Sequence, residues 1–170
     1  MKTKLIALVL VCVLVLPLAL CGCSGSQVSV YPVLSATSAK AGDTVTVQVL
    51  IEDCERLCSS DLYLTYDRNY VTPVNGEEAV IADLYTVLSN DVDAAGNGFF
   101  KYSFYTATTI DLDDVVLFTV QFTVNADAPA GEAAFRIAID EFNKGNDAQG
   151  NTYTDIKSEV SDGYAVLTVS

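Results

Sequence analysis

One stretch of this chain places a carboxylate, an aromatic ring and a hydroxyl on alternate positions, an arrangement suited to contacting another molecule. Residues 59–74 read SSDLYLTYDRNYVTPV, and the alternating row within them is Asp61, Tyr63 and Thr65. The positions that follow each of these residues are occupied by Leu62, Leu64 and Tyr66. A period of two is typical of a strand with one buried and one exposed face. We therefore predict that the second row is core and that the first row is a candidate docking surface.

Catalysis explains these residues poorly. The chain contains no histidine, so a serine or cysteine nucleophile has no ordinary general base. Two carboxylates at a suitable separation can hydrolyse glycosides, but no pair is singled out among the 22 acidic residues. The sequence therefore predicts a binding protein without enzymatic activity and without a cofactor.

Direct sugar binding is an alternative use of the same exposed face. The chain has no tryptophan, but Tyr63 and Tyr105 are candidates for a small aromatic platform that binds polysaccharide. Alternatively, these two tyrosines only cover the outer surface of the sheet and bind no ligand.

Two polar segments offer oxygen ligands of the kind that calcium prefers. The first contains Asp111, Asp113 and Asp114. The second contains Asn143, Asn146 and Asp147. Such segments are more often solvated turns, so a structural calcium ion is left open.

The N-terminal segment predicts export and a lipid anchor. Residues 1–4 form a short basic head, and the apolar run 5–20 is short for a membrane span but fits the core of a secretory signal. A leucine stands three positions before Cys23 and a glycine directly before it, which resembles the bacterial lipobox. This resemblance implies a signal over residues 1–22, lipidation of Cys23, a short anchor segment over 23–27 and a location at the outer face of the cytoplasmic membrane. Cys21 fits less well because Leu20 would occupy a small-residue position, and the alternative is an ordinary signal that leaves a secreted protein.

The two remaining cysteines in the body of the chain are Cys54 and Cys58. In an exported protein, a pair at this spacing predicts a disulfide that closes a small loop. A redox pair or half of a zinc site is the alternative, but with Cys12, Cys21 and Cys23 assigned to the signal and anchor, no histidine or further cysteine is left to complete a zinc site.

The charge of the chain excludes one class of partner. Without residues 1–22, 7 basic and 22 acidic residues give a net charge of −15. Such a charge repels phosphate backbones and anionic headgroups, so nucleic acid is not expected as a partner, and contact with the membrane is expected only through the lipid anchor. The remaining 148 residues are enough for one domain, over residues 28–170.

Short apolar alternations between Gly, Asn, Asp and Pro predict an all-β fold, a single β-sandwich of about nine strands. The most regular alternations cover residues 44–51, 99–106 and 115–124. Residues 79–88 are ambiguous between a short helix and an irregular strand. The segments predicted to be turns, loops or links include 52–59, 75–78, 89–98, 109–114 and 143–151.

Four blocks of this sequence, taken in order, resemble a cohesin domain. They are AGDTVTVQV at 41–49, DLYLTYDRNYV at 61–71, DDVVLFTVQFTVNADAPAG at 113–131 and DGYAVLTV at 162–169. The order and spacing of the blocks are more specific than any one of them. The resemblance implies a nine-stranded jelly roll that binds dockerins, which are small calcium-loaded modules. Dockerins are carried by glycoside hydrolases or scaffold subunits. The implied setting is a cellulosome-type assembly that degrades polysaccharide.

The resemblance also implies that the partner lies across a sheet face built from the third, fifth, sixth and eighth strands. Asp61 matches an acidic contact residue of the third strand, and Tyr63 and Thr65 share its face. The outward positions of the expected fifth strand are Lys101, Ser103 and Tyr105, and those of the expected sixth strand are Thr119 and Gln121.

The chain departs from the family pattern at a few positions. Thr106 stands where the family often has an acid, the tyrosine-proline pattern before that strand is missing, and the Cys54–Cys58 pair is unusual. No D-x-[DN]-x-[DN]-G loop is present, which indicates the receptor and not the dockerin. We therefore expect a surface adaptor that recruits dockerin-bearing proteins.

Overall fold

The fold is built from β-strands. A computed structural model describes residues 27–81, 84–146 and 152–170; the predicted signal segment and Cys23 lie outside them. Nine strands in this part contain six residues or more: β1 (Ser29–Leu34), β3 (Thr44–Glu52), β4 (Cys54–Tyr66), β5 (Val71–Glu78), β6 (Leu84–Val92), β7 (Gly98–Leu112), β8 (Val115–Val124), β9 (Gly131–Gly145) and β12 (Tyr164–Val169). The shorter elements are β2 (Ser38–Ala39), β10 (Tyr153–Asp155), β11 (Ser161–Asp162) and a 3₁₀ turn, η2 (Lys157–Glu159). Among the described residues, no helix is both long and apolar enough to cross a membrane.

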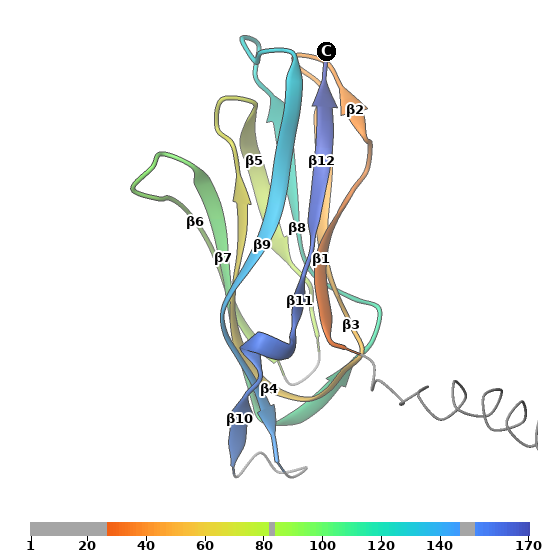
Figure 1. The fold of residues 1–170 in the computed structure, drawn as a ribbon, viewed down its shortest axis with the longest axis vertical. Coiled ribbons are helices and arrows are strands. Elements are labelled where there is room, and N and C mark those ends of the chain that lie inside the picture. Colours follow the sequence, from red (N-terminus) through yellow and green to blue (C-terminus); the bar gives the residue numbers. More distant parts are fainter. Residues whose placement is uncertain (1–26, 82–83, 147–151) are drawn as a thin grey trace, which may run out of the picture.

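The strands form a sandwich of two sheets (Figure 1). The five-stranded sheet has the order β11-β1-β3-β8-β5, and the seven-stranded sheet has the order β2-β12-β9-β4-β7-β6 with β10 paired to β9. Most connections carry the chain from one sheet to the other, and the β6–β7 hairpin is an exception. The predicted all-β sandwich is confirmed.

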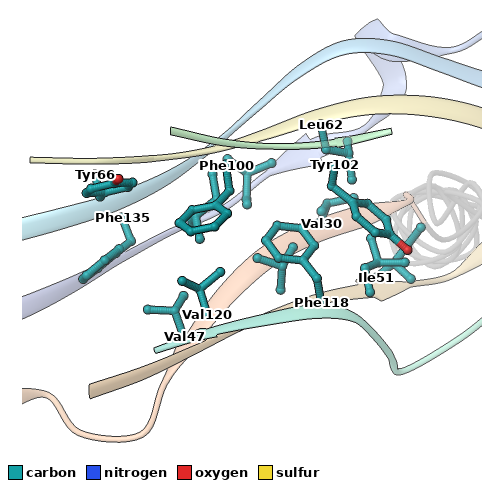
Figure 2. Packing of buried hydrophobic residues seen from close by; sticks show 14 of the residues in the cluster. Val30, Val47, Ile51, Leu62, Tyr66, Phe100, Tyr102, Phe118, Val120 and Phe135 are labelled. Carbon is teal, nitrogen blue, oxygen red and sulfur yellow. The ribbon is translucent and has the colours of Figure 1, made fainter. Parts of the chain in front are cut away.

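The core lies between the two sheets, where alternate residues of facing strands meet. Phe100 and Tyr102 of β7 are buried, as are Phe118 and Val120 of β8. Figure 2 shows the first pair entering the core from one layer and the second pair from the other. Burial of one such apolar side chain contributes about 1.5–3 kcal/mol to folding. This burial fixes the orientation of β7, and the alternate residues of β7 therefore point to solvent.

The turn predicted at residues 75–78 is wrong, because these residues continue β5 to Glu78. The glycine that suggested a turn has a different role. A Cβ atom at Gly76 would lie 3.0 Å from Leu88 Cδ2 and 3.1 Å from Phe100 Cε1. A side chain at position 76 would therefore press on Leu88 of β6 and Phe100 of β7, which would have to shift slightly to admit it.

The link predicted at residues 52–59 is also wrong, because β3 ends at Glu52 and β4 begins at Cys54. Asp53 and Arg56 adopt the left-handed conformation, each with φ of 55°, and the pairing of β4 with β7 shifts register here. The Arg56 N–H donates to Asp111 Oδ1 at 2.7 Å, which ties the irregular start of β4 to the end of β7.

The predicted disulfide between Cys54 and Cys58 is wrong as well, because no disulfide is formed. Cys54 points into the core with 2 % of its surface exposed, whereas Cys58 is half-buried. Both lie on the irregular start of β4, where the pairing with β7 shifts register on either side of Leu57. Burial raises the pKa of the Cys54 thiol to about 12, which disfavours the reactive thiolate.

Four further segments contain more strand than predicted. The ambiguous segment 79–88 contributes the start of strand β6, and the loop predicted at 89–98 is wrong over its first four residues, because β6 continues to Val92. The loop at 109–114 shortens because β7 reaches Leu112, and β9 continues to Gly145. The rest of the loop predicted at 143–151 lies largely outside the described residues.

Candidate partner-binding face

The outward side of β4 and β7 brings together six of the eight residues predicted to bind a partner. In the β4–β7 ladder, Asp61 lies opposite Ser103 and Tyr63 lies opposite Lys101. The outward positions next to these pairs belong to Thr65 of β4 and Tyr105 of β7. The six side chains therefore share one surface of the seven-stranded sheet.

Thr119 and Gln121 do not share this surface. Both lie on β8, which belongs to the five-stranded sheet. The error comes from counting strands, because the segment that forms β6 was not recognised as a strand. With β6 counted as the fifth main strand after β1, β3, β4 and β5, β7 becomes the sixth and β8 the seventh.

Strand β6 adds residues to the face that the sequence reasoning missed. Tyr85, Val87 and Ser89 lie opposite Tyr105, Ser103 and Lys101, respectively. We call these three residues and the six above the docking face. The segment LYTVLSNDV gave no clear signal because apolar residues occupy both its inward and its outward positions.

The centre of the docking face is an ion pair. Lys101 Nζ lies 2.7 Å from Asp61 Oδ2, and about 30 % of each side chain is exposed (33 % and 29 %, respectively). Burial of the Asp61 carboxylate opposes its ionisation, but hydrogen bonds from Lys101 and Ser103 outweigh burial and lower its pKa. The hydrogen bond to Asp61 in turn raises the pKa of Lys101. Both groups are therefore charged at neutral pH and are paired with each other.

The face also carries tyrosine rings, and one of them lies beside this ion pair. Lys101 Nζ lies 5.6 Å from the centroid of the Tyr63 ring, which packs edge-on against Phe99 at 5.5 Å between centroids. Tyr105 instead stacks on Tyr85, with centroids 5.0 Å apart and an interplanar angle of 15°. Tyr63 and Tyr105, the two rings considered for sugar binding, therefore pack against different neighbours and not against each other.

The acidic residues considered for calcium do not converge. Within residues 27–81, 84–146 and 152–170, no three acidic, histidine or cysteine side chains are arranged to hold a metal ion. Asp111 accepts the backbone bond from Arg56 described above, and Asp113 Oδ1 accepts one from Asp53 N–H at 3.3 Å. Asp114 is a turn residue with φ of 53°. Asp111 and Asp113 therefore accept hydrogen bonds from the backbone around the β3–β4 turn, and Asp114 forms part of the β7–β8 turn.

The second segment considered for calcium is likewise held by hydrogen bonds within the chain. The amide of the buried Asn143 donates to Ser59 Oγ at 3.0 Å and to Glu141 Oε1. Asn146 Nδ2 donates to Thr152 Oγ1 at 3.1 Å. Asp147 lies outside the described residues.

Solved cohesin structures have the same fold as this chain. The seventh ScaB type I cohesin from Pseudobacteroides cellulosolvens is 20% identical with a TM-score of 0.64, over 85% of this chain and 92% of that chain. A Coh-OlpA–Doc918 complex from Clostridium thermocellum gives 15% identity and a TM-score of 0.61, over 85% of this chain and 100% of that chain. A non-cellulosomal cohesin from Archaeoglobus fulgidus gives 20% identity and a TM-score of 0.59, over 85% of this chain and 92% of that chain.

The sequence comparison identifies the family. No curated protein is significantly similar in sequence to this chain. The family model of the cohesin domain, however, matches residues 32–163, which include the whole docking face and every strand except β12 and the first three residues of β1. The chain therefore belongs to the cohesin domain family, whose members are non-catalytic binding modules.

Proposed function

We propose that the docking face binds the dockerin module of a partner protein, as in a cellulosome-type assembly. The observation that carries this proposal is the family match over residues 32–163, which contains the whole face. Two of the structurally similar proteins were solved as cohesin–dockerin complexes, Coh-OlpA with Doc918 and a cohesin of Acetivibrio cellulolyticus scaffoldin B with a Cel5 dockerin.

The geometry of the face suits such a partner. The surface combines exposed rings with hydroxyls and a carboxylate on adjacent strands, a mixture typical of protein interfaces. The central strands are paired on both sides, so the side chains that a partner meets are held on a rigid sheet.

The test is binding of purified dockerins to the wild-type domain by calorimetry, with Doc918 and the Cel5 dockerin as first probes. We expect Asp61→Ala combined with Tyr63→Ala to weaken binding at least about tenfold, because the change leaves the Lys101 charge unpaired and removes the ring that packs beside it. Thr119→Ala combined with Gln121→Ala is the matched control, because these residues lie on the other sheet. Wild-type affinity in the first double variant would contradict this site.

A capture experiment separates dockerin binding from the sugar alternative. The immobilised domain is incubated with culture supernatant of the source organism, and captured proteins are identified by mass spectrometry. Retention of dockerin-bearing proteins that is lost with EDTA supports the proposal. Retention of the domain on insoluble polysaccharide, without a dockerin-bearing partner, would support direct sugar binding instead.

We further propose that Cys23 carries a lipid that holds the domain at the outer face of the cytoplasmic membrane. The support is the sequence around residue 23, where a leucine at position 20 and a glycine at position 22 precede the cysteine. An acyl chain contributes about 0.8 kcal/mol of membrane affinity for each buried CH₂ group. Mass spectrometry of the membrane-bound protein should find the modification at Cys23, and Cys23→Ala should release the domain whereas Cys21→Ala should not.

A further inference from the structure

The docking face contains a compact group of exposed apolar side chains away from its central ion pair. Tyr85 and Tyr105 are 57 % and 59 % exposed, and Val87 is 63 % exposed. We call these three residues the aromatic ridge. Large apolar side chains gathered on a surface are typical of sites that bind another protein. The ridge therefore offers contact area that nothing else in the described part of the chain covers.

The two tyrosines hold each other in a fixed arrangement. They lie directly opposite one another in the β6–β7 ladder and stack with an interplanar angle of 15°. Cross-strand aromatic pairs of this kind stabilise a sheet and restrict the rotation of both rings. A partner that binds the ridge meets a preorganised surface, which lowers the entropy lost on association.

The centre of the face offers little charge to a partner. Of the nine residues of the docking face, Asp61 and Lys101 are the charged ones, and they form an ion pair with each other. The net charge of the face is zero, whereas the whole chain carries −13. A partner that presents a cation to Asp61 must compete with Lys101 and Ser103 for the carboxylate.

The ridge and the centre form one continuous surface. Val87 lies opposite Ser103, and Ser103 lies opposite Asp61 on the next strand. The same partner can therefore cover both.

We propose that the aromatic ridge is the anchor of the docking face and that its occupant is a flat, uncharged apolar patch on the dockerin. This inference rests on the proposed function and specifies the chemistry of the partner surface. Affinity then comes from apolar area buried on Tyr85, Val87 and Tyr105. The Asp61–Lys101 pair orients neighbouring groups and contributes little to affinity.

The first experiment compares variants of the ridge with matched controls, using calorimetry with a dockerin from the panel above. Tyr85→Ala and Tyr105→Ala should each weaken binding at least about tenfold, the loss typical of an aromatic hot spot. Tyr85→Phe and Tyr105→Phe keep the stack and should bind within about threefold of the wild type. Tyr153→Ala removes an equally exposed tyrosine, 66 % exposed on β10, and should leave affinity unchanged.

The second experiment removes the charge at the centre. Asp61→Asn combined with Lys101→Met leaves no unpaired charge and should change the dissociation constant less than about threefold. Raising the salt concentration should also have little effect, since the aromatic ridge is uncharged and the two charges of the docking face pair with each other.

The outcomes separate this inference from the proposed function. A wild-type domain that binds a dockerin, with ridge variants that bind equally well, would overturn the ridge and leave the function intact. A large loss in the charge-neutral double variant, with a steep dependence on salt, would also overturn it. Failure of the wild type to bind any dockerin would contradict both.

Discussion

At the scale of single residues, two buried tyrosines differ in whether the hydroxyl has a partner. The Tyr66 hydroxyl donates to Asn90 Oδ1 at 3.0 Å. The Tyr102 hydroxyl is buried and has no hydrogen-bond partner among the described residues. Burial raises the pKa of both phenols, so both remain protonated at neutral pH. An unpaired buried hydroxyl costs stability because its hydrogen bonds to water are lost on folding.

This difference predicts opposite effects of the same substitution. Tyr66→Phe should lower the free energy of unfolding by about 1 kcal/mol, because it removes a hydrogen bond and leaves Asn90 without that donor. Tyr102→Phe should leave the free energy unchanged or raise it by up to about 1 kcal/mol, because it removes an unsatisfied group. Urea denaturation of both variants checks the pair. Equal destabilisation by the two substitutions would contradict the hydrogen-bond assignment.

The Asp61 carboxyl predicts a dependence of stability on pH. Its pKa is lower in the folded state, so its contribution is complete above the ordinary value near 4. The contribution is lost as the pH falls through the lower folded-state pKa, because the unfolded chain then binds the proton first. Below about pH 4, the unfolding free energy of the Asp61→Asn variant should therefore decrease less steeply with falling pH than that of the wild type. Parallel pH profiles of wild type and variant would contradict this role.

At the scale of elements, regular alternation of hydropathy decided how well a strand could be predicted. Strand β8 has the bounds that its alternation indicates, and the buried row of β7 was also predicted. Strand β6 was missed because Tyr85 and Val87 put apolar residues on its outward side. The feature that hid this strand is the one that makes the aromatic ridge. A local pattern cannot tell an exposed apolar row from a buried one.

The candidate site was predictable only in part for a related reason. Periodicity placed Asp61, Tyr63 and Lys101 on the outward faces of their strands. It could not show which sheet each strand joins, so Thr119 and Gln121 were assigned to the wrong side. Sheet membership depends on pairing between distant segments, which a period of two does not encode.

Gly76 gives a prediction at this same scale. The structure explains it by close packing of β5 against β6 and β7, so a methyl group would press against Leu88 and Phe100. Gly76→Ala should lower the free energy of unfolding by about 1–3 kcal/mol, the usual cost of overpacking. Glu77→Ala, on the exposed neighbouring position, is the control and should change it by less than about 0.5 kcal/mol. If both variants melt like the wild type, the packing explanation is wrong.

At the scale of the whole molecule, the described chain carries many carboxylates but no cluster that holds a metal ion. Its acidic residues near the β3–β4 turn are engaged by backbone N–H groups. We therefore expect EDTA to leave the melting temperature of the isolated domain unchanged, measured by calorimetry in calcium-containing buffer. A clear fall in the melting temperature would reveal a structural cation.

The two sheets give the molecule two broad surfaces, and the account assigns partner binding to one of them. The most direct test is to record NMR spectra of the ¹⁵N-labelled domain while an unlabelled dockerin that binds it is added. The amide signals of docking-face residues on β4, β6 and β7 should shift, with the largest changes near Tyr85 and Tyr105, while those of Thr119 and Gln121 stay in place. Shifts concentrated on β8 and its neighbours in the five-stranded sheet, with β6 and β7 unchanged, would contradict the account.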